Sequence, residues 1–287
     1  MTVTTLKPIA HCFGVIKAIE LAKQVINDNK DKKVYVFGLL VHNEEVTKEL
    51  TDLGIITIDT TKIDPIERLK EFKSGKIVIF TAHGHPKAYE KILNDNNVEF
   101  YDATCIKVKE CFNIIKEAKE VIYIGKANHP EANAALTMND NVHFYDINSK
   151  FDYSSIRSGN PIVINQTTLS YLELEDIHRD IKKHIPGAII NDEICNATLL
   201  RQKAIKELSD DVDALIIVGS KKSSNTMKLY EVAKATHVDK EIIFVENVEE
   251  LKKIENLNLF KNVVISSGTS TPLTTITKIE KYLKGEE

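Results

Sequence analysis

The stretch Asp102-Ala-Thr-Cys105 places a cysteine between an apolar run at 98–101 and a helix-like segment at 106–121. The same arrangement occurs twice more in the chain: Cys12 follows an apolar run at 5–10, and Cys195 follows one at 188–194. Ninety-three residues separate the first cysteine of this set from the second, and ninety separate the second from the third. A cysteine at a strand-to-helix turn, repeated at a nearly fixed interval, indicates a repeated structural unit.

The composition limits the classes of protein to consider. The 287 residues include 38 basic and 42 acidic side chains, for a net charge of −4, which argues against nucleic-acid binding through overall charge. No apolar run approaches the roughly 18 residues of a membrane span, and the first ten residues lack the apolar core of a signal peptide. We therefore expect a cytoplasmic protein with no membrane segment, whose four cysteines are thiols or metal ligands rather than disulfides.

Strand-like runs rich in Val, Ile and Phe alternate with amphipathic helical segments along the whole chain. The expected strands lie at 34–37, 77–80, 121–124, 162–164, 214–218 and 262–265, and clear helical segments lie at 43–53, 86–94, 172–184 and 226–237. Unbroken apolar runs are typical of parallel strands that are buried on both faces. Alternation of such strands with helices predicts an α/β fold.

Polar loops follow these strands and repeat with the spacing of the cysteines. One set contains His42, His129 and 223–225, and a second contains His83, Thr167 and Ser270. We predict three small α/β domains with parallel sheets in a pseudo-threefold arrangement, with the first strand free to pack in the third domain. The expected domains are residues 1–97, 98–187 and 188–287; the alternatives are one long doubly wound sheet, or chance spacing.

Ligands of α/β sheets bind at the carboxyl ends of parallel strands, so three domains facing one axis would bring the cysteines and polar loops into one cavity. Three converging thiolates suit a metal centre with one open position, and thiolates select zinc, cuprous copper or iron–sulfur clusters. No local CxxC pair typical of structural zinc is present, and a cubane cluster suits ligands from three separate domains. For any single cysteine, burial as a small apolar side chain is the alternative. This alternative is expected for Cys111, about 240° further round a helix from Cys105.

The polar loops carry side chains that suit a phosphate or diphosphate: His42, His83, His129, Thr167, Ser223, Asn225 and Ser270. Glu131 lies two residues after His129 and is a candidate proton donor beside a buried metal; capping of a helix N-terminus is the alternative. Four other histidines are expected to be structural, namely His143, His178, His184 and His237, while His11 and His85 are left unassigned.

These residues together resemble the 4-hydroxy-3-methylbut-2-enyl diphosphate reductase family of LytB-type iron–sulfur reductases. The resemblance covers about residues 6–280 and rests on eight short segments in the same order. They are Cys12-Phe-Gly-Val, Val41-His42-Asn43, Ala82-His83-Gly84, Asp102-Ala-Thr-Cys105, His129-Pro-Glu131, Gln166-Thr167-Thr168-Leu-Ser, Ile194-Cys195-Asn-Ala-Thr-Leu-Leu-Arg-Gln202 and Val218-Gly-Ser-Lys-Lys-Ser223-Ser224-Asn225. The chain departs from the usual family sequence in Ile9-Ala-His11 before Cys12, at Ile106 and within Ala132-Asn-Ala134.

The resemblance implies a [4Fe–4S] cluster with three cysteine ligands, Cys12, Cys105 and Cys195, and one open iron that takes the substrate hydroxyl. It implies that the allylic diphosphate substrate is bound by His42, His83, His129, Thr167, Ser223, Ser224, Asn225 and Ser270. Glu131, His129 and Thr167 would be catalytic, and Glu131 would supply protons. Reduced ferredoxin or flavodoxin would supply two electrons, and the products would be isopentenyl and dimethylallyl diphosphate, in the last step of the non-mevalonate isoprenoid pathway.

Two other functions fit parts of the same pattern. Quinolinate synthase resembles three α/β domains around a cluster held by one cysteine each, although its motifs match these loops less well. A non-catalytic iron–sulfur redox sensor would need the cysteines but not a pocket rich in His, Ser and Asn.

Overall fold

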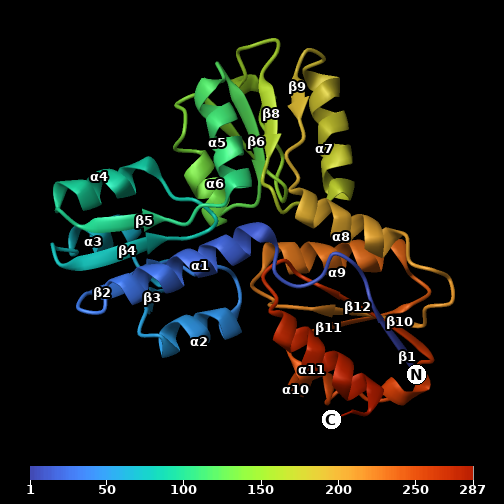
Figure 1. Ribbon diagram of the computed structural model, residues 1–287. Helices are drawn as coiled ribbons and strands as arrows, with labels where there is room; N and C mark the ends of the chain where they lie inside the picture. The colour runs from blue at the N-terminus through green and yellow to red at the C-terminus, as the bar shows by residue number, and fades with distance from the viewer. Residues whose placement is uncertain (287) are drawn as a thin grey trace.

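The computed structural model describes residues 1–286 and contains three separate sheets, each of four parallel strands. Each sheet and its helices form one lobe, and the three lobes meet at the centre of the molecule (Figure 1). The predicted α/β class with three parallel sheets is confirmed. Within the described residues, none of the helices is both long and apolar enough to span a bilayer.

The first sheet has the strand order β3-β2-β4-β5. Its strands are β2 (Lys33–Phe37), β3 (Ile56–Ile58), β4 (Lys76–Phe80) and β5 (Glu99–Asp102). The helices of this lobe are α1 (Phe13–Asp28), α2 (Glu44–Asp52), α3 (Pro65–Lys70) and α4 (Lys87–Asp95), with a 3₁₀ turn at Thr60–Lys62. Alternate side chains of β2 enter two separate apolar clusters, one shared with α1 and α2 and the other with α3 and α4. The sheet is therefore buried on both faces, as its unbroken apolar strands predict.

The second sheet repeats this order as β7-β6-β8-β9. Its strands are β6 (Val121–Gly125), β7 (Val142–Asp146), β8 (Ile162–Asn165) and β9 (Ile189–Asn191), and its helices are α5 (Ile106–Glu117), α6 (Pro130–Ala135) and α7 (Tyr171–His184), with a 3₁₀ turn at Tyr153–Ser155. Every residue of the central strand β6 is buried, because helices pack on both faces.

The third sheet has the order β11-β10-β12-β1, so that the N-terminal strand completes the C-terminal lobe. Its strands are β10 (Ala214–Val218), β11 (Glu241–Val245), β12 (Asn262–Ser267) and β1 (Thr2–Thr5). The helices are α8 (Asn196–Lys206), α9 (Ser224–Thr236), α10 (Val248–Leu251) and α11 (Leu273–Lys284), with a 3₁₀ turn at Leu257–Leu259. β1 pairs with β12 from Thr2↔Asn262 to Thr5↔Ile265, which places both termini in one lobe (Figure 1).

The fourth strands of the first and second sheets lie beyond the residues at which the sequence places the domain boundaries. β5 pairs with β4 and β9 pairs with β8, so the first sheet extends to Asp102 and the second to Asn191. The boundaries expected near residues 97 and 187 fall just before these strands. A repeat in the sequence indicates the length of each unit but not the residue at which the unit begins. The expected strand at 5–10 also differs, since β1 ends at Thr5. The division into three domains stays a prediction.

Each cysteine of the repeat lies at a junction between two lobes. Cys12 follows β1, Cys105 follows β5 and Cys195 follows β9, and the next residue begins α1, α5 or α8. Each therefore follows the fourth strand of one sheet and starts the first helix of the next unit. This equivalence explains why three residues so far apart in sequence can meet on one axis (Figure 1).

Candidate functional site

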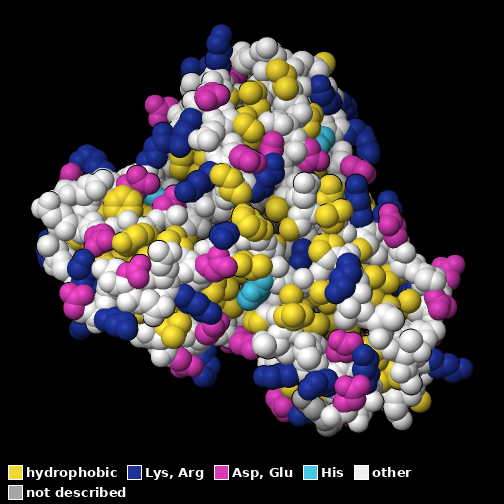
Figure 2. Space-filling model, viewed as in Figure 1, with side chains coloured by type: hydrophobic (Ala, Val, Ile, Leu, Met, Phe, Trp, Pro, Cys, Tyr) yellow, Lys and Arg dark blue, Asp and Glu magenta, His cyan; other side chains and the backbone are white. Residues whose placement is uncertain are grey.

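A cavity of about 90 Å³ lies between the three lobes. Figure 2 shows that hydrophobic side chains reach the surface in the region where the lobes meet. All twelve residues expected from the sequence to form the site line this one cavity. They are Cys12, His42, His83, Cys105, His129, Glu131, Thr167, Cys195, Ser223, Ser224, Asn225 and Ser270. The structure therefore brings the expected residues together, while the role of each stays a prediction.

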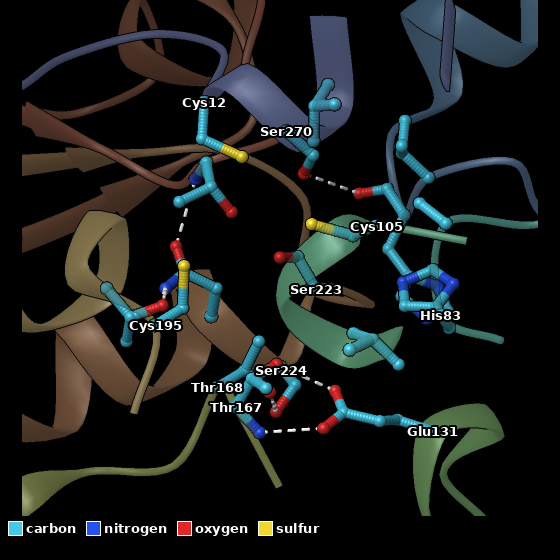
Figure 3. Close-up of a pocket in the computed structure, with 18 of the residues that line it drawn as sticks. Cys12, His83, Cys105, Glu131, Thr167, Thr168, Cys195, Ser223, Ser224 and Ser270 are labelled. Carbon is cyan, nitrogen blue, oxygen red and sulfur yellow. Dashed lines mark hydrogen bonds between the residues drawn. The ribbon is translucent and has the colours of Figure 1, made fainter. Parts of the chain in front are cut away.

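The three cysteines occupy equivalent positions at the N-caps of α1, α5 and α8. None of the three makes a side-chain capping hydrogen bond, and all three line the cavity. Figure 3 shows the sulfur atoms of Cys12, Cys105 and Cys195 facing a common space. Burial raises the pKa of the Cys105 and Cys195 thiols, and the helix backbone N–H groups of Lys107 and Ala197 oppose this change.

Gly14 allows the first turn of α1 to approach the second cysteine closely. A Cβ atom at this position would overlap the Sγ atom of Cys105 and lie 4.0 Å from the Sγ atom of Cys12. Only a residue without a side chain therefore fits between the two thiols. Cys111, in contrast, is fully buried in the apolar core of the second lobe, as expected.

Three histidine side chains form one wall of the cavity. The ring centroids of His42 and His83 are 4.4 Å apart, and the ring of His129 lies 6.1 Å and 5.8 Å from them. Burial lowers the pKa of all three, to about 3 for His129, so the rings are neutral when no anion is present. Nδ1 of His129 accepts a hydrogen bond from the N–H of Glu131 at 3.2 Å, which leaves the proton of the neutral ring on Nε2. Nδ1 of His42 is buried without a hydrogen-bond partner among the described residues.

Glu131 is a buried carboxyl group in the first turn of α6, with 1% of its surface exposed. Its Oε1 accepts a hydrogen bond from the N–H of Thr167 at 2.8 Å, and its Oε2 accepts one from the Thr167 hydroxyl at 2.8 Å (Figure 3). Oε1 also accepts a hydrogen bond from the hydroxyl of Tyr123 at 3.3 Å. Burial raises the pKa of Glu131 to about 7, although these hydrogen bonds act in the opposite direction. The side chain binds the neighbouring loop rather than capping its own helix.

The N-terminus of α9 forms a second wall of the cavity. The Ser223 hydroxyl caps this helix by accepting a hydrogen bond from the N–H of Thr226 at 3.3 Å. Asn225 is fixed by donating to the Thr198 hydroxyl at 3.0 Å and accepting from the N–H of Thr269 at 2.9 Å. A helix N-terminus with hydroxyl and amide side chains favours binding of an anion.

Ser270 and Ser224 connect these walls to other loops. The Ser270 hydroxyl donates to the backbone oxygen of His42 at 3.2 Å. The Ser224 hydroxyl accepts from Thr168 at 3.2 Å and from the Gln166 amide at 3.3 Å.

The two unassigned histidines do not line the cavity. His85 stacks on Phe80 with a centroid distance of 3.8 Å, and its Nε2 lies 2.9 Å from Glu90. His11 is half-buried beside Cys12 but is not among the lining residues. The four histidines expected to be structural also lie away from the cavity.

Several residues at or behind the site were missed from the sequence. Thr168 and Thr198 line the cavity, and Tyr123 and Arg201 lie behind it and bind the groups that form it. Tyr123 carried a detectable signal, since a hydroxyl inside a fully apolar strand needs a buried partner. Two of the three backbone oxygens that Arg201 binds, those of Ser267 and Ala10, are remote in sequence and gave no local signal.

Comparisons with known proteins agree with this geometry. The family model described as "LytB protein" matches residues 3–284. A 4-hydroxy-3-methylbut-2-enyl diphosphate reductase of Bacillus subtilis (strain 168) is 35% identical over 290 residues, covering 99% of this chain and 91% of the relative. The protein of the same name from Fusobacterium nucleatum subsp. nucleatum is 33% identical over 99% of this chain, which spans only 34% of that longer relative.

Solved structures give the same result. A structure of (E)-4-hydroxy-3-methyl-but-2-enyl diphosphate reductase, described as the terminal enzyme of the non-mevalonate pathway, superimposes with a TM-score of 0.70 at 28% identity and covers 100% of both chains. The Plasmodium falciparum reductase shares the fold with a TM-score of 0.82 at 24% identity, over 98% of this chain and 86% of its own. Because the family model and the bacterial relatives cover nearly the whole chain, the protein belongs to the LytB family.

Proposed function

We propose that the protein is a 4-hydroxy-3-methylbut-2-enyl diphosphate reductase. It would remove the hydroxyl group of (E)-4-hydroxy-3-methylbut-2-enyl diphosphate and release isopentenyl and dimethylallyl diphosphate, the last step of the non-mevalonate pathway. The observation that carries this proposal is the meeting of three thiols, three histidines and one buried carboxyl group in one cavity. Membership of the LytB family favours this function over the quinolinate-synthase-like and sensor alternatives.

Cys12, Cys105 and Cys195 would hold a [4Fe–4S] cluster with one open iron. The donor set fits, because three thiols face one space and Gly14 leaves room between two of them. Among the described residues, no group of three Cys, His, Asp or Glu side chains is placed to hold a single metal ion. When bound, the cluster would supply electrons and a Lewis-acidic iron for the substrate hydroxyl.

The histidine wall and the N-terminus of α9 would bind the diphosphate. His42, with an unpartnered Nδ1, and His129, with its proton on Nε2, provide donors on one side. Ser223, Ser224 and Asn225 provide donors on the other. A diphosphate would raise the pKa of the buried rings, because an adjacent anion favours the charged imidazolium, so substrate binding is expected to take up protons.

Glu131 would deliver protons to the reacting end of the substrate. Loss of the hydroxyl as water and formation of a new C–H bond together need two electrons and two protons. A carboxyl group with a pKa of about 7 holds its proton near neutral pH and can release it to a neighbour. The Thr167 hydroxyl, 2.8 Å from Oε2, can pass that proton onward and hold the substrate alcohol in place.

A reduced ferredoxin or flavodoxin would be the electron donor, as the family resemblance implies. Phe13 and Ile106 directly follow Cys12 and Cys105, and 65% and 58% of their surfaces are exposed. Apolar side chains exposed beside two of the thiols support contact with a protein donor at a short distance from the cluster.

The pH dependence of turnover tests the proton donor. Glu131 is protonated below its pKa and ionised above it, so kcat is expected to fall as the pH rises through about 7. Tyr123→Phe removes a hydrogen bond that favours the ionised carboxylate, and the fall is therefore expected at higher pH. The shift should not exceed about one pH unit, because the bond is long.

Tyr145→Phe is the control for this experiment, because Tyr145 is also buried but lies on β7 and makes no hydrogen bond to Glu131 among the described residues. Its profile should match that of the unaltered protein. An unshifted profile for Tyr123→Phe would show that the Glu131 proton does not set the pH dependence.

The proposed function is tested by anaerobic turnover of (E)-4-hydroxy-3-methylbut-2-enyl diphosphate with dithionite-reduced methyl viologen. The reconstituted protein is expected to oxidise the viologen and to form both isopentenyl and dimethylallyl diphosphate. A protein with a complete cluster that leaves this substrate unchanged would exclude the reductase, and cluster redox cycling without substrate consumption would indicate the sensor.

A further inference from the structure

Arg201 is a buried cation on α8 with no carboxylate partner among the described residues. Only 2% of its surface is exposed, and its hydrogen bonds all go to backbone oxygens. Nε donates to Ser267 at 3.1 Å, Nη1 to Ala197 at 2.7 Å and Nη2 to Ala10 at 2.6 Å. Carbonyl dipoles solvate the guanidinium but leave its charge uncompensated, and a buried charge without a counter-charge is costly.

Two of the three backbone oxygens belong to segments that carry cavity cysteines, and the third belongs to β12. Ala10 lies two residues before Cys12, Ala197 lies two residues after Cys195, and Ser267 ends β12. One planar guanidinium therefore connects the segment after β1, the first turn of α8 and the end of β12. A lysine ammonium is a point donor on a flexible stem and does not reproduce this three-way fork.

The segment before Cys12 needs such support. Ala10 has a φ of 63°, in the left-handed region that a residue with a Cβ atom rarely adopts. Its N–H donates to the Ser267 hydroxyl at 2.9 Å and its oxygen accepts from Arg201, so both backbone polar groups of Ala10 are fixed. The N–H of Cys12 donates to the oxygen of Thr269 at 3.0 Å, which extends the same attachment to the cysteine.

The charge of Arg201 also lies close to the cysteines in the fold. Nη1 and Nη2 donate to the oxygens of Ala197 and Ala10, each of which is two residues from a cavity cysteine. Burial lowers the pKa of the guanidinium, and negative charge at Cys12 and Cys195 opposes this change. Electrostatic interactions between buried groups are weakly screened by solvent. A thiolate-bound cluster gains negative charge when it is reduced, so a fixed cation nearby favours the reduced form.

We propose that Arg201 is a positioning residue of the cluster site, which holds the Cys12 and Cys195 segments together and raises the reduction potential of the cluster. The proposal rests on the proposed function, because it requires a cluster at the three cysteines. The negative charge of the thiolate-bound cluster would then balance the positive charge of the guanidinium.

The two roles are separated by Arg201→Met and Arg201→Lys, with Lys203→Met as the control. Lys203 is an exposed cation on the same helix, so its loss changes the net charge equally but at the surface. The measurements are iron content after anaerobic reconstitution and desalting, midpoint potential by redox titration of the cluster, and thermal unfolding of the cluster-free protein. Arg201→Met is expected to lose iron severalfold more than the unaltered protein and to shift the remaining cluster to a more negative potential.

Arg201→Lys keeps a charge but not the fork, so it is expected to lose iron while its potential stays near that of the unaltered protein. Lys203→Met should change neither quantity. Normal iron retention in both Arg201 variants would overturn the positioning role, and an unchanged potential in Arg201→Met would overturn the role of the charge. A lower unfolding temperature, with normal iron content and a normal midpoint potential, would show that Arg201 only stabilises the fold. This result would overturn both the positioning role and the role of the charge.

Two further results, an unfolded variant and an unaltered protein without a cluster, are interpreted separately. If Arg201→Met does not fold, iron retention in Arg201→Lys decides the positioning role, and Arg201→Gln, which also removes the charge, replaces Arg201→Met in the measurement of the midpoint potential. An unaltered protein that takes up no cluster would instead contradict the proposed function, before any variant is compared.

Discussion

Glu131→Gln is expected to lower kcat by about 10²–10⁴-fold, the usual contribution of a positioned proton donor, while the cluster stays in place. Glutamine has nearly the same shape as glutamic acid. Its amide oxygen can accept the hydrogen bonds from the Thr167 N–H and Tyr123, and its amide group can donate to the Thr167 hydroxyl. The substitution therefore removes the acidic proton and leaves the hydrogen-bonded geometry almost unchanged.

Glu120→Gln is the matched control for this measurement. Glu120 is a buried carboxylate in the same lobe, but it directly precedes β6 at the end of the sheet remote from the cavity, where it accepts hydrogen bonds from the backbone of Arg157 and Ser158. Turnover and iron content are measured for both variants under the same anaerobic conditions. Unchanged turnover in Glu131→Gln would remove Glu131 from the mechanism, and an equal loss in Glu120→Gln would point to the fold rather than to proton delivery.

Cys105→Ala is expected to leave the protein almost free of iron, whereas Cys111→Ala should keep its cluster. Cys105 lines the cavity and supplies one of only three expected ligands. Cys111 lies on the same helix, is fully buried in the core of the second lobe and does not line the cavity. Removing its sulfur should cost about 1 kcal/mol in stability, as for other small truncations in a core.

Iron and sulfide content after anaerobic reconstitution, together with thermal unfolding of the cluster-free proteins, measures this difference. Similar iron loss in both variants would contradict the assignment of Cys105 as a ligand and Cys111 as a core residue. Full iron retention in Cys105→Ala would show that other residues hold the cluster.

The sequence was sufficient to predict the fold and twelve of the residues that line the cavity because both depend on periodicity. Parallel strands carry their polar loops at one edge of a sheet, so His42, His83, His129 and Thr167 could be assigned to a shared site without knowledge of any contact. The equal spacing of the cysteines extended this reasoning from one sheet to three.

Features that depend on long-range packing could not be predicted in the same way. Three edge strands were missed because they are short or half-buried: β3, β7 and β11. The residues at which each repeated unit begins and ends could not be predicted either, since β5 and β9 lead into the cysteines in sequence but pair with earlier strands. Arg201 meets Ala10 across 191 residues of chain, and no local pattern marks such a contact.

The pairing of β1 with β12 has a consequence for how the protein is made. The strand that leads into Cys12 is synthesised before both other sheets, yet its partner, Asn262–Ile265, follows them in the chain. The first and second sheets can therefore complete their hydrogen bonds during synthesis before β1 has a partner. Cys12 is the first of the three cysteines to be translated but the last to reach its place, so a cluster at this site is expected to be installed only after β12 has been made.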